Sequence, residues 1–528
     1  MAKNKLIFKG FSFTIIMSPI KSKIEKTVPE INDLIKTIRE ESRGNKIPVL
    51  PLLRRAKSEY DLDLIRLAYD FAKQAHEGQA RKSGEPYINH SLETAITLAK
   101  IGMDQATIIA GLLHDVPEDT DYSLVDIEKN FGPEVAKLVA GITKLGIIKY
   151  RGMEKYAENL RKMFISMAQD IRIVMIKMAD RLHNLKTLAS LPPEKQKRIA
   201  QESLEIYAPI ANRLGMGSIK GDLEDLAFPY VYPEKYLWLK ENILPQIKLR
   251  MEYIEKVIKL VEKELVAEKI KIVSIHGRQK RLYSLYQKLT RPQYNSDITK
   301  IHDLVALRII LPTISDCYHV LGIIHRLWKP LPGRIKDYIA QPKPNGYQSL
   351  HTTVFCLDGK IVEFQIRTKN MHEQAEYGIA AHWHYKENNK NSKKISDKGY
   401  TLPKKFNWIQ DLVKWQKEIQ DNQQYLKSLS VDFFHNRIFV FTPKGDVIDL
   451  PEDATPVDFA YHVHSWIGDH CSGSKINSQM SSLDSTLKNG DVIEIITDKN
   501  RKGPSLDWLK FVKTGAAKDK IRSKAAKY

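Results

Sequence analysis

Cysteine is scarce in this sequence, and its placement excludes one large class of protein. The chain of 528 residues has three cysteines, Cys317, Cys356 and Cys471, which lie far apart and form no CxxC pair. Secreted domains stabilised by disulfides carry many closely spaced cysteines. The sequence therefore predicts a protein of the reducing cytoplasm.

Long apolar runs are also absent. The stretch from Phe11 to Met17 is too short and too interrupted for a signal sequence or a membrane span. Translation starts at Met1 or at Met17, and the sequence leaves both open. The chain has no GxxxxGK[ST] loop, so any transfer of a nucleotide's phosphates must use another architecture. We find no internal repeats.

Negative charge is in deficit, because 83 Lys and Arg residues face 63 Asp and Glu residues and give a formal net charge of +20. This excess favours polyanionic partners such as nucleotides or RNA. A lysine-rich bias of the whole genome explains it nearly as well. Charge alone therefore does not identify a partner.

The pattern along the chain changes in a way that predicts three folded parts. Residues 57–235 have helical periodicity almost throughout, which predicts an all-α domain. A long charged helix at about 236–270 leads to strands at 304–311, 351–355 and 360–368, so the second domain is predicted to be mixed α/β.

The remainder contains a small module. After an aperiodic linker, residues 437–450 predict a β-hairpin, and a short helix and a strand at 490–497 complete a ubiquitin-like order. We expect a disordered leader at residues 1–45, an all-α domain at 46–235 and a mixed α/β domain at 236–390. A linker with a helix follows at 391–434, then the small module at 435–499 and a C-terminal tail at 500–528.

Three fragments of the helical part suggest a metal site: RKSGEPYINH (81–90), LLHDVPEDT (112–120) and KMADRLHNLKT (177–187). Two imidazoles and two carboxylates come from them, a set that suits Mn²⁺, Fe²⁺ or Zn²⁺ and favours the harder metals: His90, His114, Asp115 and Asp180. Two further acids follow the His-Asp pair by one turn and could handle the proton of a coordinated water. Each fragment alone reads equally well as a solvated helix face. However, the apolar turn before LLHD indicates that this pair abuts the core, where buried acids need a partner.

These fragments resemble the HD-type metal phosphohydrolases, and most closely the hydrolase domain of the Rel/Spo alarmone enzymes. The resemblance implies that the Mn²⁺ ligands are His90, His114, Asp115 and Asp180, that Glu118 and Asp119 are the catalytic acids, and that Arg81, Lys82 and Asn184 contact the nucleotide. Pro117 stands where the family more often has a β-branched residue, and we expect little effect from it.

A second set of residues lies in the mixed α/β part. In VEFQIRT (362–368), apolar residues alternate with Glu363, Gln365 and Arg367, which predicts a strand with one polar face. Asp303 begins a similar strand, and two acids on one sheet can bind Mg²⁺ and accept a hydroxyl proton. A half-buried antiparallel sheet with a polar outer face would give the same alternation. Tyr347, in the turn-rich PNGYQS segment, could stack on a base.

Taken together, HGRQKRLYSLYQKL (276–289), HDLVALR (302–308), PGRIKDYIAQPKPNGYQSLHTT (332–353) and VEFQIRT resemble the nucleotidyltransferase-like synthetase domain of the same family. The family transfers the β,γ-pyrophosphate of ATP to the 3′-hydroxyl of GDP or GTP. The resemblance implies that Asp303 holds Mg²⁺ and that Glu363 activates the 3′-hydroxyl. It also implies ATP contacts at Arg278, Lys280, Ser284 and Lys288, and guanine nucleotide contacts at Lys343, Asn345, Tyr347 and His351. Residues 334–337 match the R-x-K-D form of bifunctional members.

Residues 437–471 resemble a TGS domain, the β-grasp module that follows the catalytic domains in long Rel/Spo proteins. In that setting it senses uncharged tRNA at the ribosome. The resemblance implies, weakly, that His464 contacts the tRNA. His462 and His470 are better explained as structural. Long members continue with further regulatory regions, so a chain that stops here is either naturally short or truncated.

The sequence thus predicts a bifunctional enzyme that makes and hydrolyses (p)ppGpp, with ATP, GDP or GTP and (p)ppGpp as its ligands and no membrane association. One alternative is a hydrolase-dominant enzyme with a weak synthetase. Another is a non-catalytic sensor of nucleotides or tRNA. A mere binding protein has no need of Glu118, Asp119 and Glu363, which argues against the sensor.

Overall fold

The computed structural model describes residues 61–146, 153–291, 301, 304–343, 345–381, 409–410, 412–413, 437–488 and 490–525. The expected leader at 1–45, the two candidate start residues, most of the linker at 391–434 and Asp303 lie outside the described residues.

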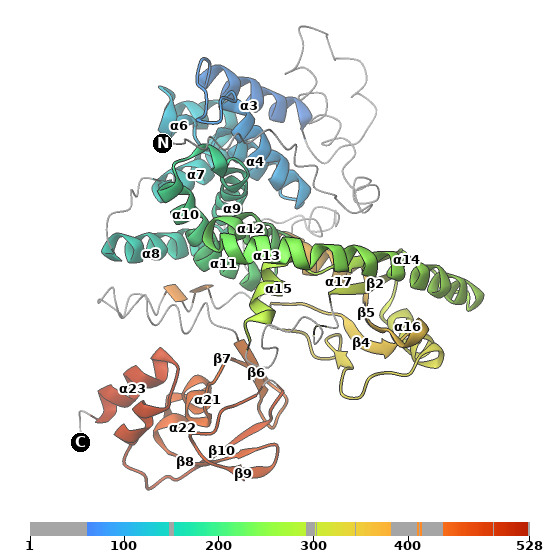
Figure 1. Ribbon diagram of the computed structural model, residues 1–528. Coiled ribbons are helices and arrows are strands. Elements are labelled where there is room, and N and C mark those ends of the chain that lie inside the picture. Colours follow the sequence, from blue (N-terminus) through green and yellow to red (C-terminus); the bar gives the residue numbers. More distant parts are fainter. Residues whose placement is uncertain are drawn as a thin grey trace, which may run out of the picture.

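The first part of the chain is all helical, as predicted (Figure 1). Its elements are α3 (Leu62–Ala75), α4 (Ile88–Lys100), α5 (Gln105–Leu113), α6 (Val116–Asp119), α7 (Leu124–Gly146), α8 (Met153–Gln169), α9 (Ile171–Lys186), α10 (Pro193–Glu202), a π-helical turn (Ser203–Tyr207), α11 (Ala208–Arg213) and α12 (Gly217–Val231).

Helices α4, α5 and α9 pack against one another at the centre of this domain. Almost all of their apolar side chains are buried, among them Leu98, Leu112 and Met178. Helix α5 begins after Asp104, whose side chain accepts a hydrogen bond from the backbone of Thr107. The centre of the domain is therefore where the predicted metal ligands lie, since α4, α5 and α9 carry or adjoin them.

The prediction of a single long helix at 236–270 is wrong, because two helices occupy this region. A single residue, Ile243, separates helix α13 (Pro233–Asn242) from helix α14 (Leu244–Ala267). Pro245 lies in the first turn of α14, where proline is tolerated because its missing N–H would have no partner there. The same missing donor prevents α13 from continuing through it.

A five-stranded sheet follows, with β1 (Ser274–Gln279), β2 (Val305–Leu311), β3 (Lys336–Asp337), β4 (Leu350–Phe355) and β5 (Ile361–Thr368) in the order β1-β2-β5-β4-β3. Strands β2 and β5 are parallel, and the other pairs are antiparallel. Helices α14 and α16 (Ile314–Leu327) pack on the sheet, and α15 (Leu282–Leu289) and α17 (Lys369–Tyr377) complete this domain. The predicted strands are confirmed, while β1 and β3 were not expected.

The sheet has one apolar and one polar face. Val362, Phe364 and Ile366 of β5 are buried in the core shared with α14 and α16. The intervening Glu363, Gln365 and Arg367 point to the other face. The alternation predicted from the sequence is therefore confirmed.

The C-terminal module contains β6 (Arg437–Phe441), β7 (Val447–Pro451), α21 (Pro456–Val463), α22 (Ser465–Asp469), β8 (Cys471–Ile476), β9 (Gln479–Ser481) and β10 (Ile493–Thr497). Phe441 forms a parallel bridge to Val492, next to β10, which joins the β6–β7 hairpin to the other strands. This is the predicted β-grasp arrangement.

The residues after 500, expected as a tail, pack onto this module. Trp508, Val512 and Ile521 are buried against α21, and α23 (Gly515–Ala525) lies beside it. The side chain of Asp458 accepts hydrogen bonds from the backbone of Lys513 and Thr514. In the described part of the chain, no helix is long and apolar enough to cross a membrane.

Candidate active sites

Four residues predicted as metal ligands meet at the centre of the helical domain. His90 lies in the first turn of α4, His114 and Asp115 join α5 to α6, and Asp180 lies in the middle of α9. His90 Nε2 is 3.3 Å from Asp115 Oδ2 and 3.3 Å from Asp180 Oδ1, and His114 Nε2 is 3.2 Å from Asp115 Oδ1. One atom from each of His90, His114 and Asp115 lies within 4.8 Å of the others.

The one hydrogen bond of the His114 ring leaves its second nitrogen available to a ligand. His114 Nδ1 donates to the backbone oxygen of Gly111 at 2.9 Å, so its Nε2 carries no proton when the ring is neutral. This Nε2 is buried and has no hydrogen-bond partner, and burial lowers the pKa of His114. An unpartnered imidazole nitrogen beside two carboxylates is the donor set of a divalent cation site.

The electrostatics of His90 agree with this fit. Burial alone would lower its pKa, but hydrogen bonds to Asp115 and Asp180 raise the pKa above its ordinary value. The two carboxylates thus stabilise positive charge between them, supplied by either a proton or a metal ion. The residues present fit a divalent metal.

The two predicted catalytic acids lie on α6, directly after the ligands. Burial, together with the charge of Asp115, raises the pKa of Glu118 to about 7. Asp119 Oδ2 accepts a hydrogen bond from the hydroxyl of Tyr87 at 2.6 Å, and the same hydroxyl lies 2.9 Å from Asp115 Oδ2. Tyr87, which the sequence reasoning missed, therefore links an acid of α6 to a metal ligand.

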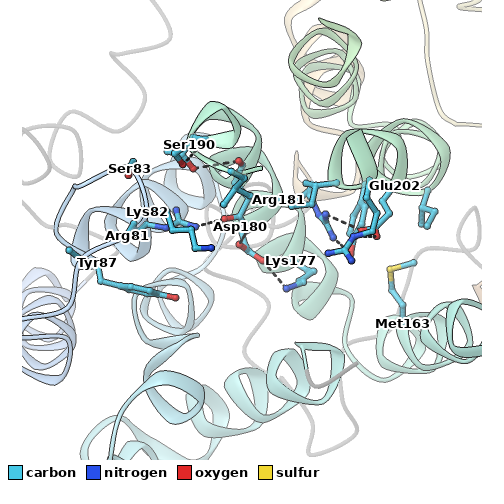
Figure 2. A pocket seen from close by; sticks show the side chains of 18 of the residues that line it. Arg81, Lys82, Ser83, Tyr87, Met163, Lys177, Asp180, Arg181, Ser190 and Glu202 are labelled. Atoms are coloured by element: carbon cyan, nitrogen blue, oxygen red, sulfur yellow. Dashed lines mark hydrogen bonds and ion pairs between the residues drawn. The ribbon is translucent and has the colours of Figure 1, made fainter. Parts of the chain in front are cut away.

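A cavity of about 560 Å³ opens beside Asp180 (Figure 2). The three residues predicted to contact the nucleotide line this cavity. Arg81 and Lys82 reach into it from the loop before α4, and Asn184 lines it from α9. Sequence reasoning missed three further cations that line it, Lys177, Arg181 and Arg198. They belong to helical patterns that give no sign of a ligand. Arg181 of α9 and Arg198 of α10 come together through Glu202, with which each forms an ion pair, at 3.2 and 3.8 Å.

A second cluster lies on the polar face of the sheet. His351 Nδ1 is 3.0 Å from Glu363 Oε1, and His351 Nε2 is 2.8 Å from the hydroxyl of Tyr347. Because the tyrosine hydroxyl can donate to Nε2, the neutral ring can donate from Nδ1 to the carboxylate. Lys343 Nζ lies over the rings of Tyr338 and Tyr347, at 4.6 and 5.4 Å from their centroids. Four of the predicted residues thus lie together, namely Lys343, Tyr347, His351 and Glu363. Asn345 lies in the same turn as Tyr347, whose backbone N–H donates to the side chain of Asn345.

The predicted ATP contacts lie at the end of β1 and on α15. Ser284 and Lys288 are one turn apart on α15, and Arg278 and Lys280 precede this helix. Burial lowers the pKa of His351 and of Lys343 in the second cluster, and the charge of the nearby Arg278 adds to this lowering. Ser284 Oγ is 3.5 Å from Glu224 of α12.

Sequence reasoning missed two buried arginines on this face. Arg308 of β2 and Arg367 of β5 share one carboxylate, Glu376 Oε1, at 3.0 and 3.1 Å. Burial, followed by the charge of Arg367, lowers the pKa of Arg308 to about 9. The Nε atoms of both arginines are buried without a hydrogen-bond partner. An excess of buried positive charge with unused donors suits an anionic ligand. The polar row of VEFQIRT was the signal that could have identified Arg367.

In the C-terminal module, His464 is exposed and its side chain caps α22 by accepting from the backbone of Trp466. Trp466 is itself exposed and stacks on His470, with ring centroids 4.4 Å apart. His470 therefore has a structural contact, while His464 has both a capping contact and an exposed position.

Three family models match the chain in order: the HD domain at residues 68–217, the region found in RelA/SpoT proteins at 277–390, and the TGS domain at 438–497.

Curated relatives match most of the chain. A GTP pyrophosphokinase of Myxococcus xanthus is 47% identical over 476 residues, which are 89% of this chain and 61% of the relative. A guanosine-3′,5′-bis(diphosphate) 3′-pyrophosphohydrolase of Aquifex aeolicus is 49% identical, over 87% of this chain and 64% of the relative. A bifunctional (p)ppGpp synthase/hydrolase RelA of Mycobacterium tuberculosis is 46% identical, over 91% of this chain and 65% of the relative.

The chain thus spans less than two thirds of the length of each of these relatives. The matches nevertheless cover 87–91% of this chain. With these three domains and this identity over most of its length, the chain belongs to the RelA/SpoT family.

Proposed function

We propose that the chain is a bifunctional alarmone enzyme that transfers pyrophosphate from ATP to the 3′-hydroxyl of GDP or GTP and hydrolyses the resulting (p)ppGpp to GDP or GTP and pyrophosphate. The observation that carries this proposal is the presence of two separate sets of acids on one chain. His90, His114, Asp115 and Asp180 gather beside one cavity, while Glu363 lies on the polar face of the sheet.

For hydrolysis, we propose that these four residues hold Mn²⁺. A divalent cation there would polarise the phosphate and lower the pKa of a coordinated water. Arg81, Lys82 and Asn184 would bind the nucleotide from the loop before α4 and from α9. Glu118, whose pKa of about 7 suits proton transfer at neutral pH, would take up the proton of the attacking water, with Asp119 beside it.

For synthesis, Glu363 would accept the proton of the 3′-hydroxyl as the new bond to the β-phosphorus of ATP forms, while the bond from that phosphorus to the oxygen of the α-phosphate breaks and AMP leaves. His351 holds this carboxylate and is held in turn by Tyr347, so the base and the ring proposed to stack on guanine are linked. Arg278, Lys280, Ser284 and Lys288 would bind ATP. The Mg²⁺ ligand Asp303 is proposed from the sequence alone. Arg308 and Arg367 add positive charge for the phosphates.

Two finer points belong to the same proposal. Uncharged tRNA at the ribosome is the partner we propose for the TGS domain, with the exposed His464 as its contact. The cytoplasm is the compartment we propose, because Cys317, Cys356 and Cys471 are all free and buried.

The experiment that tests the proposal incubates the full chain with ATP, GTP and Mg²⁺, and separately with (p)ppGpp and Mn²⁺. We expect pyrophosphorylated guanine nucleotide in the first reaction and released pyrophosphate in the second. Hydrolysis alone would favour the hydrolase-dominant alternative. Nucleotide binding without turnover in either reaction would establish a sensor.

The charge of Lys343 predicts a pH dependence for guanine nucleotide binding. Partial desolvation, together with the charges of Lys336 and Lys220, lowers the pKa of Lys343 to about 8. The ammonium group is therefore charged below pH 8 and neutral above it, so affinity for an anionic nucleotide should fall as the pH rises through 8. We expect KM for GDP to rise several-fold between pH 7 and pH 9 in the parent. Lys343→Arg keeps its charge across this range, and an equal rise in that variant would contradict the assignment.

The contact between the two catalytic domains predicts that their activities oppose each other. The backbone oxygen of Leu214, after α11, accepts from Ile379 beyond α17, and Asn345 Nδ2 donates to the backbone oxygen of Asn212. Gly215 (φ +77°) packs so closely that an added Cβ would lie 2.7 Å from the oxygen of Asn345. A nucleotide that orders the turn of Asn345 can therefore bias the helices that line the hydrolase cavity, by its differential affinity for two states.

We expect GDP with an unreactive ATP analogue to slow hydrolysis several-fold. Tyr347→Ala, which removes the proposed stacking, should weaken this inhibition. Hydrolysis that does not respond to the analogues in the parent would mean independent domains.

A further inference from the structure

The guanidinium group of Arg81 makes two side-chain contacts that concern the metal ligands. Its NH1 is 3.0 Å from Nδ1 of His183, and its NH2 donates to Oδ1 of Asn184. His183 Nδ1 is in turn 2.7 Å from Nδ1 of His90, and Asn184 Nδ2 donates to Asp180 Oδ1. One side chain from the loop before α4 therefore reaches two ligands through one intermediary each.

The direction of each hydrogen bond follows from the chemistry of arginine, which only donates. His183 Nδ1 must accept from Arg81, so it can receive a proton from His90 but cannot give one. His90 therefore carries a proton on Nδ1, which leaves its Nε2, 3.3 Å from Asp115 Oδ2 and from Asp180 Oδ1, as the atom that a metal ion would bind.

The amide of Asn184 is fixed by the same argument. Its oxygen faces the guanidinium, because an NH₂ group in that place would oppose two donors. Its NH₂ group is consequently directed at Asp180 Oδ1 and holds this carboxylate beside His90. Both ligands are nearly inaccessible, with 2% and 4% of the surfaces of His90 and Asp180 exposed.

We propose that Arg81 is a positioning residue of the metal site, which fixes the tautomer of His90 through His183 and the orientation of Asp180 through Asn184. This inference rests on the proposed metal-dependent hydrolase. It adds to the nucleotide contact proposed for Arg81 a role that operates before any nucleotide binds. Outer partners of metal ligands commonly change metal affinity by about 10–100-fold when they are removed.

The positive charge of Arg81 alone would have the opposite effect on metal affinity, which makes the inference testable. A guanidinium close to a cation site repels the cation, so removing this charge should strengthen metal binding. Removing the support should weaken it. Lys82 lines the same cavity with a charge of the same sign, and no hydrogen bond ties it to the ligands. Lys82→Gln is therefore the matched control for charge.

The experiment titrates Mn²⁺ into the nucleotide-free full chain and follows binding by calorimetry or by the paramagnetic signal of free Mn²⁺. We expect Arg81→Gln to weaken Mn²⁺ binding about 10–100-fold, and Lys82→Gln to leave it unchanged or slightly tighter. Arg81→Lys should also weaken binding, because one ammonium group cannot reproduce the planar fork. The synthetase activity of each variant, which uses another domain, confirms that the chain is folded.

A further variant tests the network itself. Asn184→Ala removes the second arm, and the double variant with Arg81→Gln should cost less than the sum of the two single changes, since both act on Asp180. Unchanged or tighter binding in Arg81→Gln, or full restoration in Arg81→Lys, would overturn the positioning role. A parent chain that binds no Mn²⁺ would instead overturn the proposed metal site, so the two failures are distinguishable.

Discussion

Replacing Asp115 with Asn is expected to reduce the hydrolysis of (p)ppGpp by about 10³-fold, because the chain then loses the carboxylate that lies between both histidine ligands. Asp115 is 3.3 Å from His90 Nε2 and 3.2 Å from His114 Nε2. An amide keeps the shape but not the charge that binds a cation. Metal catalysis contributes several kcal/mol to such reactions, and each 1.36 kcal/mol is a factor of ten.

Synthesis is the internal control for Asp115→Asn, since Glu363 and its neighbours belong to another domain. Pyrophosphate release, bound Mn²⁺ and synthesis should be measured on the same preparation. Asp121→Asn, which removes an exposed carboxylate shortly after α6, should leave all three unchanged. Hydrolysis at the parental rate in Asp115→Asn would show that the metal is held elsewhere or is not needed.

The buried charges around this site have a further consequence. Burial would raise the pKa of Asp115, but the nearby His114 and His90 hold its pKa well below the ordinary value. A variant that removes one of these charges leaves the others less compensated, and breaking a buried pair commonly destabilises a protein by about 3–5 kcal/mol. Thermal unfolding should therefore accompany each assay, so that loss of activity is not mistaken for loss of fold.

The four residues predicted as metal ligands lie close together in the structure, and contiguous motifs made them visible in the sequence. His114 and Asp115 are adjacent, and the apolar turn before them correctly indicated that they abut the core. The partners that hold the ligands were harder to predict. Tyr87 lies in the same motif as Arg81, but nothing in its spacing shows that its hydroxyl reaches Asp115 and Asp119, which depends on how α4 packs against α6.

The missed elements have local physical reasons. Strand β1 contains few apolar residues, and its Gly277 has no side chain because Met251 and Ile254 of α14 pack against it, within 2.9 and 3.2 Å of where a Cβ would lie. A strand with Ile275 as its only large apolar side chain gives no apolar alternation. The break at Pro245 could have been predicted, since proline is a signal for a new first turn.

The second domain shows the limit of pattern reasoning more clearly. Alternation placed Glu363 and Arg367 on one face, but it could not show that Arg308 on the parallel strand shares Glu376 with Arg367. That contact depends on the register between β2 and β5, where Arg308 lies opposite Gln365. Register between two strands that lie so far apart in the sequence is a property of the folded sheet.

The same register supports the second large prediction. Glu363 lies opposite Thr353 on β4 and Ala306 on β2, in the middle of the sheet, so its backbone is rigidly held. Its Oε1 is 3.0 Å from His351 Nδ1 and 3.0 Å from Gln365 Nε2. A carboxylate that accepts two hydrogen bonds is oriented without being neutralised, as a general base requires.

Glu363→Gln should therefore lower the rate of synthesis by about 10²–10⁴-fold, the usual contribution of a general base, while GTP binding persists. The amide fills the same space but cannot accept the proton of the 3′-hydroxyl. Glu373→Gln, which removes an acid paired with Lys369 on α17, is the matched control and should keep parental turnover. The measurement that decides between roles is kcat together with GTP affinity in both variants. A tenfold loss of affinity with unchanged kcat in Glu363→Gln would make this carboxylate a binding residue, and the proton of the 3′-hydroxyl would then have to leave to another acceptor on the same face.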